Sequence, residues 1–462
     1  MRNKIITSLA LLSSSILTWA AGKSNQPNFV IFIADDLGWE DTTPYGNKVV
    51  KTPNIERLAE LGRRYDNVFL TASSSSPSRC SILTSLYPHS TGAQNLQMPL
   101  PKDKELVATP LREIGYYTMA IGKWHLGNNV KNQFDLVVDT GDKMRWTRGD
   151  DWVKALKDRP KNKPFFFYAA SNDPHRPYTD DLEKVHNPDL AIVPPYLPNV
   201  KDMREDLTDY YNAISRFDKH VGMALAELEK EGVLDNTVII IMSDNGKPFP
   251  QCKTRTNVQG MKTPFIISYP KLIKPGTSSN ALISSIDLMP TILDMVGTKY
   301  KSKVHGISFK NILSDPNAKF RNYAYAEHNW HDFMGFERSV YTDKYAFTIN
   351  FLPELPGTPP LDCLESKGYR AMQALYREGE LPPDQSDCFI MPRPSEELFD
   401  YSIDINCMKN LAFDSQYSKI VSKLKSLVIE NMKNTNDGFH GKEKLKKDGF
   451  DRNTGENVKK SK

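Results

Sequence analysis

The chain has 462 residues, of which 39% are hydrophobic and 25% charged, and its formal net charge is +4. The length is too great for one small domain and predicts two, and so small a charge gives no support for a nucleic-acid or anionic-lipid partner. The chain has five cysteines, and because this number is odd they cannot all form disulfides within the chain. None of their spacings matches a zinc-ligand pattern.

The first residues have the layout of a cleaved export signal. Arg2 and Lys4 precede an apolar run over residues 5–17, and small residues follow at Ala20 and Ala21. No other stretch approaches the roughly 18 uninterrupted apolar residues of a membrane span. We therefore expect an exported protein, periplasmic or secreted, without a membrane span.

Short apolar runs recur between helical patterns along the chain. Because continuous hydrophobicity is what strands buried on both faces require, these runs predict a largely parallel sheet covered by helices. The predicted strands are residues 29–33, 117–121, 165–170, 238–242 and 265–267.

Two helices between these strands have clear boundaries in the sequence. One begins just after Pro53 and ends at Gly62. The other carries apolar residues at steps of three and four from Leu207 to Leu228, and Gly232 ends it. This apolar face predicts packing against the sheet and no further role.

The composition changes near residue 324, where short alternating segments such as 339–349 precede a stretch rich in Pro and Gly, 352–394. This change predicts a smaller α+β domain with an antiparallel sheet. Within the second stretch, Cys363 and Cys388 flank one loop-rich segment, and we expect them to form a disulfide in an oxidising compartment. The predicted division is an export signal (1–21), a larger domain (22–323), a smaller C-terminal domain (324–440) and a solvated basic tail (441–462).

Four oxygen-bearing side chains directly follow two of the predicted strands. Asp35 and Asp36 follow the first strand, and Asp244 and Asn245 follow the fourth. Ligands of open α/β sheets collect beyond the carboxyl ends of the strands, so these side chains could converge there. Four oxygen donors suit Ca²⁺ or Mg²⁺. Either pair alone is more typical of a turn after a strand, so a metal site depends on what accompanies them.

Residues 75–79 read Ser-Ser-Pro-Ser-Arg. A serine-rich segment before a helix is by itself typical of a capping turn, and an unmodified serine needs a base or a metal to become a nucleophile. The pattern Ser-x-Pro-x-Arg, continued through residues 80–84, resembles the signature of type I sulfatases, formylglycine-dependent members of the alkaline-phosphatase superfamily. In that family the first Ser or Cys is oxidised to formylglycine. Pro77 and Arg79 place this position at Ser75.

Further motifs match the same family in their order along the chain. Residues 122–127 read Gly-Lys-Trp-His-Leu-Gly and are similar to its Gly-Lys-x-His segment, and residues 173–177, Asp-Pro-His-Arg-Pro, are similar to its histidine loop. Lys253 follows the Asp-Asn pair, as the family's sulfate-contacting lysine does. Ser85 stands where the family usually has glycine. The resemblance extends to segments 285–291, 397–400 and 410–412.

The resemblance implies a single Ca²⁺ beside the modified serine. Such a cation would neutralise sulfate charge and polarise an S–O bond. The implied calcium ligands are Asp35, Asp36, Ser75, Asp244 and Asn245.

The resemblance also implies a division of labour among the basic residues. Arg79 would support the modified side chain, and Lys123 and Lys253 would donate to the sulfate oxygens. His125 would take the proton of the second hydroxyl of a formylglycine hydrate, because imidazole titrates near neutrality. His175, together with Lys253, would protonate the departing oxygen or nitrogen.

For the whole chain, the resemblance implies an α/β fold like that of alkaline phosphatase, a mostly parallel sheet flanked by helices, with a smaller C-terminal α+β domain carrying an antiparallel sheet. It implies hydrolysis of sulfate esters or sulfamates on a sulfated carbohydrate. The motifs are most similar to the heparan N-sulfatase branch and its bacterial relatives, whose substrates include glycosaminoglycans and algal polysaccharides such as ulvan. Serine at position 75 resembles bacterial enzymes matured by a serine-type formylglycine-generating enzyme.

Two other readings stay open at this point. One is a phosphohydrolase of the alkaline-phosphatase superfamily, which would use a plain Ser or Thr with two metals. The other is an inactive carbohydrate-binding homologue, which would follow if Ser75 were never oxidised. Substrate choice is expected to depend on variable loops, with His328, His331 and Arg338 as candidate sugar-contacting residues, since exposed loop residues often bind ligands.

Overall fold

A computed structural model describes residues 26–141, 146–179 and 181–458 of the chain. Its main element is an eight-stranded sheet with the order β4-β3-β5-β1-β6-β7-β2-β8, in which only β7 runs antiparallel to its neighbours. The strands are β1 (Asn28–Ala34), β2 (Arg63–Phe69), β3 (Tyr117–Gly122), β4 (Leu136–Asp139), β5 (Phe165–Ala170), β6 (Thr237–Ser243), β7 (Ile266–Ser268) and β8 (Thr277–Ser284).

All five predicted strands are found in this sheet, within a residue or two of the predicted ends. The buried side chains of β1 alternate between two apolar cores: Phe29 and Ile31 belong to one, and Val30 and Phe32 to the other. Each face of the sheet is therefore covered, as the continuous apolar runs predict. Strands β2, β4 and β8 were not predicted, because each has several partly exposed residues and so lacks an uninterrupted apolar run.

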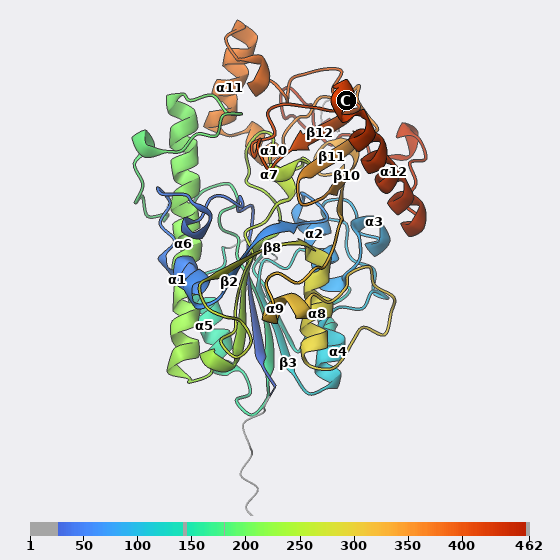
Figure 1. Ribbon diagram of the computed structural model, residues 1–462. Helices are drawn as coiled ribbons and strands as arrows, with labels where there is room; N and C mark the ends of the chain where they lie inside the picture. The colour runs from blue at the N-terminus through green and yellow to red at the C-terminus, as the bar shows by residue number, and fades with distance from the viewer. Residues whose placement is uncertain (1–25, 142–145, 180, 459–462) are drawn as a thin grey trace, which may run out of the picture.

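Helices lie on both faces of the large sheet (Figure 1), with α1, α5 and α6 on one side and α4 and α8 on the other. Both predicted helices are present, as α1 and within α6. The helices are α1 (Pro53–Leu61), α2 (Ser75–Thr84), α3 (Pro88–Thr91), α4 (Ala108–Glu113), α5 (Gly149–Asp158), α6 (Lys201–Lys230), α7 (Val258–Met261), α8 (Leu288–Met295), α9 (Lys310–Ser314), α10 (Leu361–Leu364), α11 (Lys367–Glu378) and α12 (Ser418–Thr435). No helix in these described ranges is both long and apolar enough to span a bilayer.

A second, antiparallel sheet lies beyond one end of the first (Figure 1). Its order is β12-β11-β10-β9, and α12 packs on it around a third apolar core. Two β-bridges join it to the large domain, one between Ala72 and Glu327 and one between Asn95 and Trp330. Ala72 precedes α2 in the chain and Asn95 follows it. The division at residue 324 stays a prediction. The strands are β9 (Ala324–Trp330), β10 (Met334–Tyr341), β11 (Tyr345–Asn350) and β12 (Glu396–Asp400).

The described part of the predicted basic tail, residues 441–458, has no buried residue and is solvated as expected, but it is not a free end. This segment is partly exposed, but it docks against the loop between β9 and β10. Lys446 lies over the ring of Trp330, with 3.2 Å between its Nζ and the ring centroid, and Asp448 Oδ1 accepts from Met334 N at 2.6 Å. An aromatic ring and a buried backbone donor thus provide partners for a lysine-rich segment.

The predicted disulfide is also wrong for this structure. Cys363 and Cys388 are free, buried thiols that belong to the same apolar core. Burial raises the pKa of Cys388 well above that of an ordinary thiol, so both side chains act here as small apolar groups.

Candidate active site

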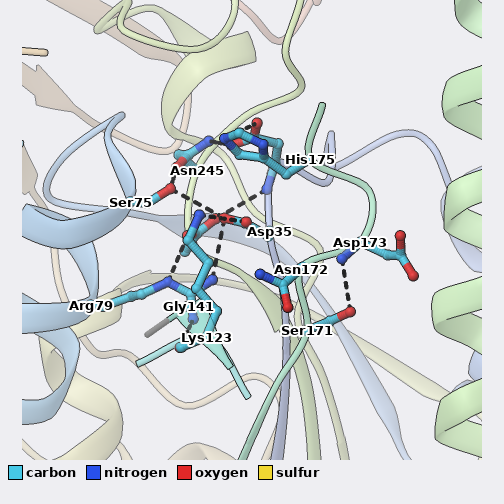
Figure 2. A network of polar contacts seen from close by, with 12 residues as sticks. Asp35, Ser75, Arg79, Lys123, Gly141, Ser171, Asn172, Asp173, His175 and Asn245 are labelled. Atoms are coloured by element: carbon cyan, nitrogen blue, oxygen red, sulfur yellow. Dashed lines mark hydrogen bonds and ion pairs between the residues drawn. The ribbon is translucent and has the colours of Figure 1, made fainter. Parts of the chain in front are cut away.

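Ser75 is the first residue of α2, and it faces the carboxyl ends of β1 and β6. Ser74 precedes it in an extended conformation and is the helix cap, and every residue of α2 is buried. The Ser75 hydroxyl lies 3.2 Å from Asp35 Oδ1 and 3.1 Å from Asn245 Oδ1 (Figure 2). The N-terminal end of a helix favours negative charge, so its position suits a group that receives an anion.

The predicted metal ligands converge because β1 and β6 are neighbours. The two strands pair in parallel with Ala34 opposite Ser243, so the residues that follow each strand lie side by side. Asp36 N donates to Asp244 Oδ1 at 3.1 Å, and Asn245 Nδ2 donates to Asp36 Oδ1 at 2.6 Å.

These oxygen donors fit a hard divalent cation. The carboxylates of Asp35, Asp36 and Asp244 are buried and offer oxygens that all lie within 4.8 Å of one another. Burial raises the pKa of Asp244 to about 7 against the opposing effect of Arg79, and the two other carboxylates add to the rise. Three buried carboxylates held this close require compensating positive charge, and oxygen donors are those that Ca²⁺ prefers.

Arg79 holds two of these carboxylates in place. Its guanidinium is fully buried; Nε donates to Asp244 Oδ2 at 2.8 Å and a terminal nitrogen to Asp35 Oδ1 at 3.3 Å. Another donor reaches the backbone oxygen of Lys123 at 3.1 Å. No hydrogen bond from Arg79 to Ser75 occurs among the described residues, so the support it gives the nucleophile position acts through Asp35 and Asp244.

Two lysines contact different carboxylates of the site. Lys123 Nζ lies 2.5 Å from Asp35 Oδ2 and its side chain is 14% exposed, whereas Lys253 Nζ lies 2.8 Å from Asp36 Oδ2 and is buried. Gly122 allows the first of these placements, because its φ is +113° and an added Cβ would lie 1.8 Å from the Ala170 oxygen of β5. Only glycine lets β3 turn here and direct Lys123 to the site.

The two predicted histidines differ in their surroundings. His125 has a left-handed backbone conformation (φ 61°), and burial, with Lys123 and Arg79 adding to the effect, lowers its pKa well below the ordinary value. Its Nδ1 is buried and has no hydrogen-bond partner in the described parts of the chain. His125 is therefore a neutral imidazole, which can accept a proton.

His175 donates from Nδ1 to the backbone oxygen of Arg176, because a carbonyl oxygen can only accept. In the neutral ring, Nε2 therefore carries the lone pair, and it lies 3.2 Å from Lys253 Nζ. Its loop is attached to the metal-ligand segment through Asp35 N, which donates to the Asp173 oxygen at 2.9 Å. Figure 2 shows this loop beside Asp35, with Asp173 N bonded to Ser171 Oγ.

The three predicted sugar-contacting residues are not exposed loop residues. His328 lies in β9 and Arg338 in β10; both are buried, and Arg338 is paired with Asp437. The expectation that they are exposed loop residues is wrong for these two, because both are buried residues of the second sheet; that they contact sugar stays a prediction. His331 does lie in a loop, also buried, and its Nδ1 is 2.8 Å from Ser74 Oγ, next to the candidate nucleophile.

Ser85, which stands where sulfatases usually have glycine, has φ 59° at the end of α2. This left-handed conformation explains the usual glycine. The Ser85 hydroxyl donates to the Ile286 oxygen at 2.7 Å, which gives the side chain a partner there.

One polar residue of the site was not predicted at all. Asp362, in α10, lies 2.9 Å from Lys253 Nζ through Oδ2. It comes from the stretch rich in Pro and Gly, more than a hundred residues beyond Lys253. No local sequence pattern connects the two positions.

Comparison with known proteins agrees with this geometry. The sequence matches the family described as Sulfatase over residues 27–298, and the one described as N-sulphoglucosamine sulphohydrolase, C-terminal, over residues 254–356. It is 28% identical to an ulvan-active sulfatase of Formosa agariphila, over 87% of this chain and 74% of that protein. It is also 28% identical to the N-sulphoglucosamine sulphohydrolase of Homo sapiens, over 89% of this chain and 90% of that protein.

Solved structures share the fold. The structure of BT4656 in complex with its substrate D-glucosamine-2-N,6-O-disulfate has a TM-score of 0.68 at 21% identity and covers 89% of this chain and 99% of that one. A phosphonate monoester hydrolase of Agrobacterium radiobacter has a TM-score of 0.66 at 15% identity, covering 89% and 96%, so the fold alone does not separate sulfur from phosphorus chemistry. The family match over more than half of the chain does: the chain belongs to the sulfatase family and is a sulfuric ester hydrolase.

Proposed function

We propose that the protein removes sulfate groups from a sulfated carbohydrate, using Ser75 after its oxidation to formylglycine and one bound Ca²⁺. The observation that supports this most is the place of Ser75, between Asp35 Oδ1 and Asn245 Oδ1 at 3.2 and 3.1 Å. A nucleophile at this position would therefore lie directly beside the side chains that fit the cation.

The two absent groups would supply distinct chemistry. Ca²⁺, held by Asp35, Asp36, Asp244, Asn245 and the modified Ser75, would offset the charge of the sulfate and polarise an S–O bond. A hydrated formylglycine would offer one hydroxyl to accept the sulfuryl group and a second whose deprotonation would allow sulfate to leave by C–O cleavage, which a serine does not provide.

The basic residues of the chain bind and orient the sulfate. Lys123 contacts Asp35 and Lys253 contacts Asp36, and we assign both lysines to donate to sulfate oxygens. Arg79 keeps its guanidinium on Asp35 and Asp244 and so maintains the shape of the cation site. Negative charge develops on the substrate as the S–O bond breaks, and the positive charges of these residues stabilise that developing charge.

Proton transfer is assigned to the two histidines. We assign the proton of the second hydroxyl to His125, because its lowered pKa keeps the imidazole neutral and able to accept a proton. His175 is in hydrogen-bond contact with Lys253 through Nε2, so this pair is placed to deliver a proton to the departing oxygen or nitrogen.

The substrate class is proposed from the relatives. One is named an ulvan-active sulfatase and another an N-sulphoglucosamine sulphohydrolase, so the carbohydrate is an algal polysaccharide or a glycosaminoglycan. Residues 1–21, outside the described part of the chain, have the pattern of an export signal. We place the enzyme in the periplasm or outside the cell, after maturation by a serine-type formylglycine-generating enzyme.

A pair of serine variants tests the nucleophile. Ser75→Ala is expected to abolish hydrolysis of 4-methylumbelliferyl sulfate and of sulfated polysaccharide, because no group remains that can be oxidised. Ser76→Ala, one residue on in the same buried helix turn, is expected to retain turnover. Appreciable sulfate release by Ser75→Ala would contradict the covalent route, and faster hydrolysis of the matching phosphate ester by the wild type would favour a phosphohydrolase.

A further inference from the structure

Asp362 is a carboxylate at the mouth of the candidate site that comes from outside both matched families. It lies in α10, whereas the two family matches end at residues 298 and 356. Its side chain is 19% exposed. Asp332 Oδ2 accepts from Leu361 N at 2.8 Å and so fixes the start of this short helix beside the site.

The two oxygens of Asp362 have different environments. Oδ2 lies 2.9 Å from Lys253 Nζ and 3.6 Å from His175 Nε2. Oδ1 is buried and has no hydrogen-bond partner in the ranges that the structure describes. A buried charged oxygen without a donor costs free energy, which a donor from a bound molecule would offset.

The carboxylate keeps its charge in this position. Burial alone would raise the pKa of Asp362, but the Lys253 ammonium, with His175 and His331, holds the pKa below its ordinary value. The cluster of Asp36, His175 and Asp362 has the spacing of a metal site. The Lys253 ammonium contacts all three residues, at 2.8 Å from Asp36, 2.9 Å from Asp362 and 3.2 Å from His175, so this cluster already contains a positive charge.

We propose that Asp362 determines substrate specificity: Oδ2 fixes Lys253, and Oδ1 accepts a hydrogen bond from a hydroxyl of the sugar that carries the scissile sulfate. This inference rests on the proposed function, in which Lys253 and His175 meet the sulfate and the departing oxygen.

The charge of Asp362 also selects against one class of sugar. A substrate that placed a carboxylate against Oδ1 would bring two like charges together without a donor between them, which discriminates strongly between otherwise similar ligands. The preferred sulfated unit is therefore a neutral sugar with a free hydroxyl beside the sulfate, and not a uronate.

The substitution Asp362→Asn separates recognition from positioning. An ammonium can only donate, so the amide oxygen of Asn must face Lys253 and its NH₂ must take the place of Oδ1. Lys253 stays fixed, while the acceptor offered to the sugar becomes a donor. Asp362→Ala removes both functions, and Glu365→Gln, an exposed residue of the following turn, is the control for loss of one negative charge.

The probes are 4-nitrophenyl sulfate, which has no sugar hydroxyl, and a panel of monosulfated galactose, glucose, N-acetylglucosamine and 2-O-sulfated uronate. All are assayed with the full-length, matured enzyme. We expect Asp362→Asn to lower kcat/KM for the best neutral sugar at least about ten-fold, as loss of a substrate hydroxyl contact does, and to raise the relative rate on the uronate. The loss on 4-nitrophenyl sulfate should be clearly smaller than the loss on the sugar, and the control Glu365→Gln should change neither rate by more than about two-fold.

Three results would overturn the inference. Equal losses on 4-nitrophenyl sulfate and on the sugar would mean that Asp362 acts only through Lys253 and His175. An unchanged kcat/KM for the sugar would mean that Oδ1 does not meet it, and preference of the wild type for the uronate would refute the charge argument. In each case the proposed function stands as long as the wild type hydrolyses 4-nitrophenyl sulfate. If the wild type hydrolyses none of the probes, both the proposed function and the role of Asp362 are refuted.

Discussion

Arg79 connects the motif that contains the candidate nucleophile with the candidate metal ligands that follow two different strands. Both of its ion pairs are fully buried, so breaking them should cost more free energy of unfolding than breaking an exposed pair does. The family resemblance predicts a supporting role for Arg79, but not that the support passes through Asp35 and Asp244, because these contacts depend on how β1, β6 and α2 meet.

We expect Arg79→Lys to destabilise the protein by a large part of the about 3–5 kcal/mol that breaking a buried charge pair costs. A single ammonium cannot reach both carboxylates as the planar guanidinium does. Urea denaturation without added metal measures the change. Arg112→Lys, at an exposed pair with Asp135, is the matched control and should cost less than about 1 kcal/mol; equal effects would contradict the assigned role.

The carboxylates of Asp35, Asp36 and Asp244 predict a calcium-dependent stability. Chelation should lower the Tm and stop turnover, and Ca²⁺ at about 100 times its Kd should restore about 2.7 kcal/mol of stability. Asp244→Asn removes one ligand charge and should weaken this response. A Tm that is the same with chelator and with Ca²⁺ would refute the metal site.

At the scale of elements, the strands buried on both faces could be predicted from the sequence because their apolar runs are continuous. The convergence of Asp35 and Asp244 followed from the general rule for the carboxyl ends of parallel strands, and Ser75 from its motif. The partner supplied by α10 could not be predicted. Asp362 reaches the site only through the docking of the C-terminal part of the chain, for which the local sequence carries no pattern. His331 is among the predicted sugar contacts, but its contact with Ser74 could not be predicted for the same reason.

A buried histidine of strand β9, His328, leads to a prediction of how the stability of the protein changes with pH. Burial, together with His331 and Arg255, lowers the pKa of His328 to about 3, below its value of about 6.5 in an unfolded chain. The unfolded state therefore binds more protons between these values, so the free energy of unfolding falls as the pH drops from about 6.5 towards 3. Denaturation at pH 7 and pH 4.5 should show this loss, and His328→Gln should show a smaller one. A slope unchanged by the substitution would contradict the burial of a neutral His328.

At the scale of the whole molecule, the two sheets and the C-terminal segment together build the site. Residues 441–458 dock on the loop that carries His331 and Asp332: Gly449 N donates to the Asp332 oxygen at 2.9 Å, and Asp448 accepts from Met334 N. Asp332 in turn fixes the helix that carries Asp362. A segment whose composition predicts a solvated end therefore supports the mouth of the site.

Truncation after residue 440 is expected to lower the Tm and to reduce kcat/KM on sulfated sugars, because the loop around Asp332 loses its partners. Truncation after Val458 keeps all the contacts named above and is the control. Unchanged Tm and turnover in the shorter protein would show that the docked segment has no part in holding the site.

The most direct test is the mass of the tryptic peptide that ends at Arg79, measured alongside turnover in protein produced with and without a serine-type maturation enzyme. The account predicts that the matured protein lacks two hydrogens at Ser75 and that sulfatase activity rises in proportion to the oxidised fraction. Full activity from protein whose Ser75 is entirely unmodified would contradict it.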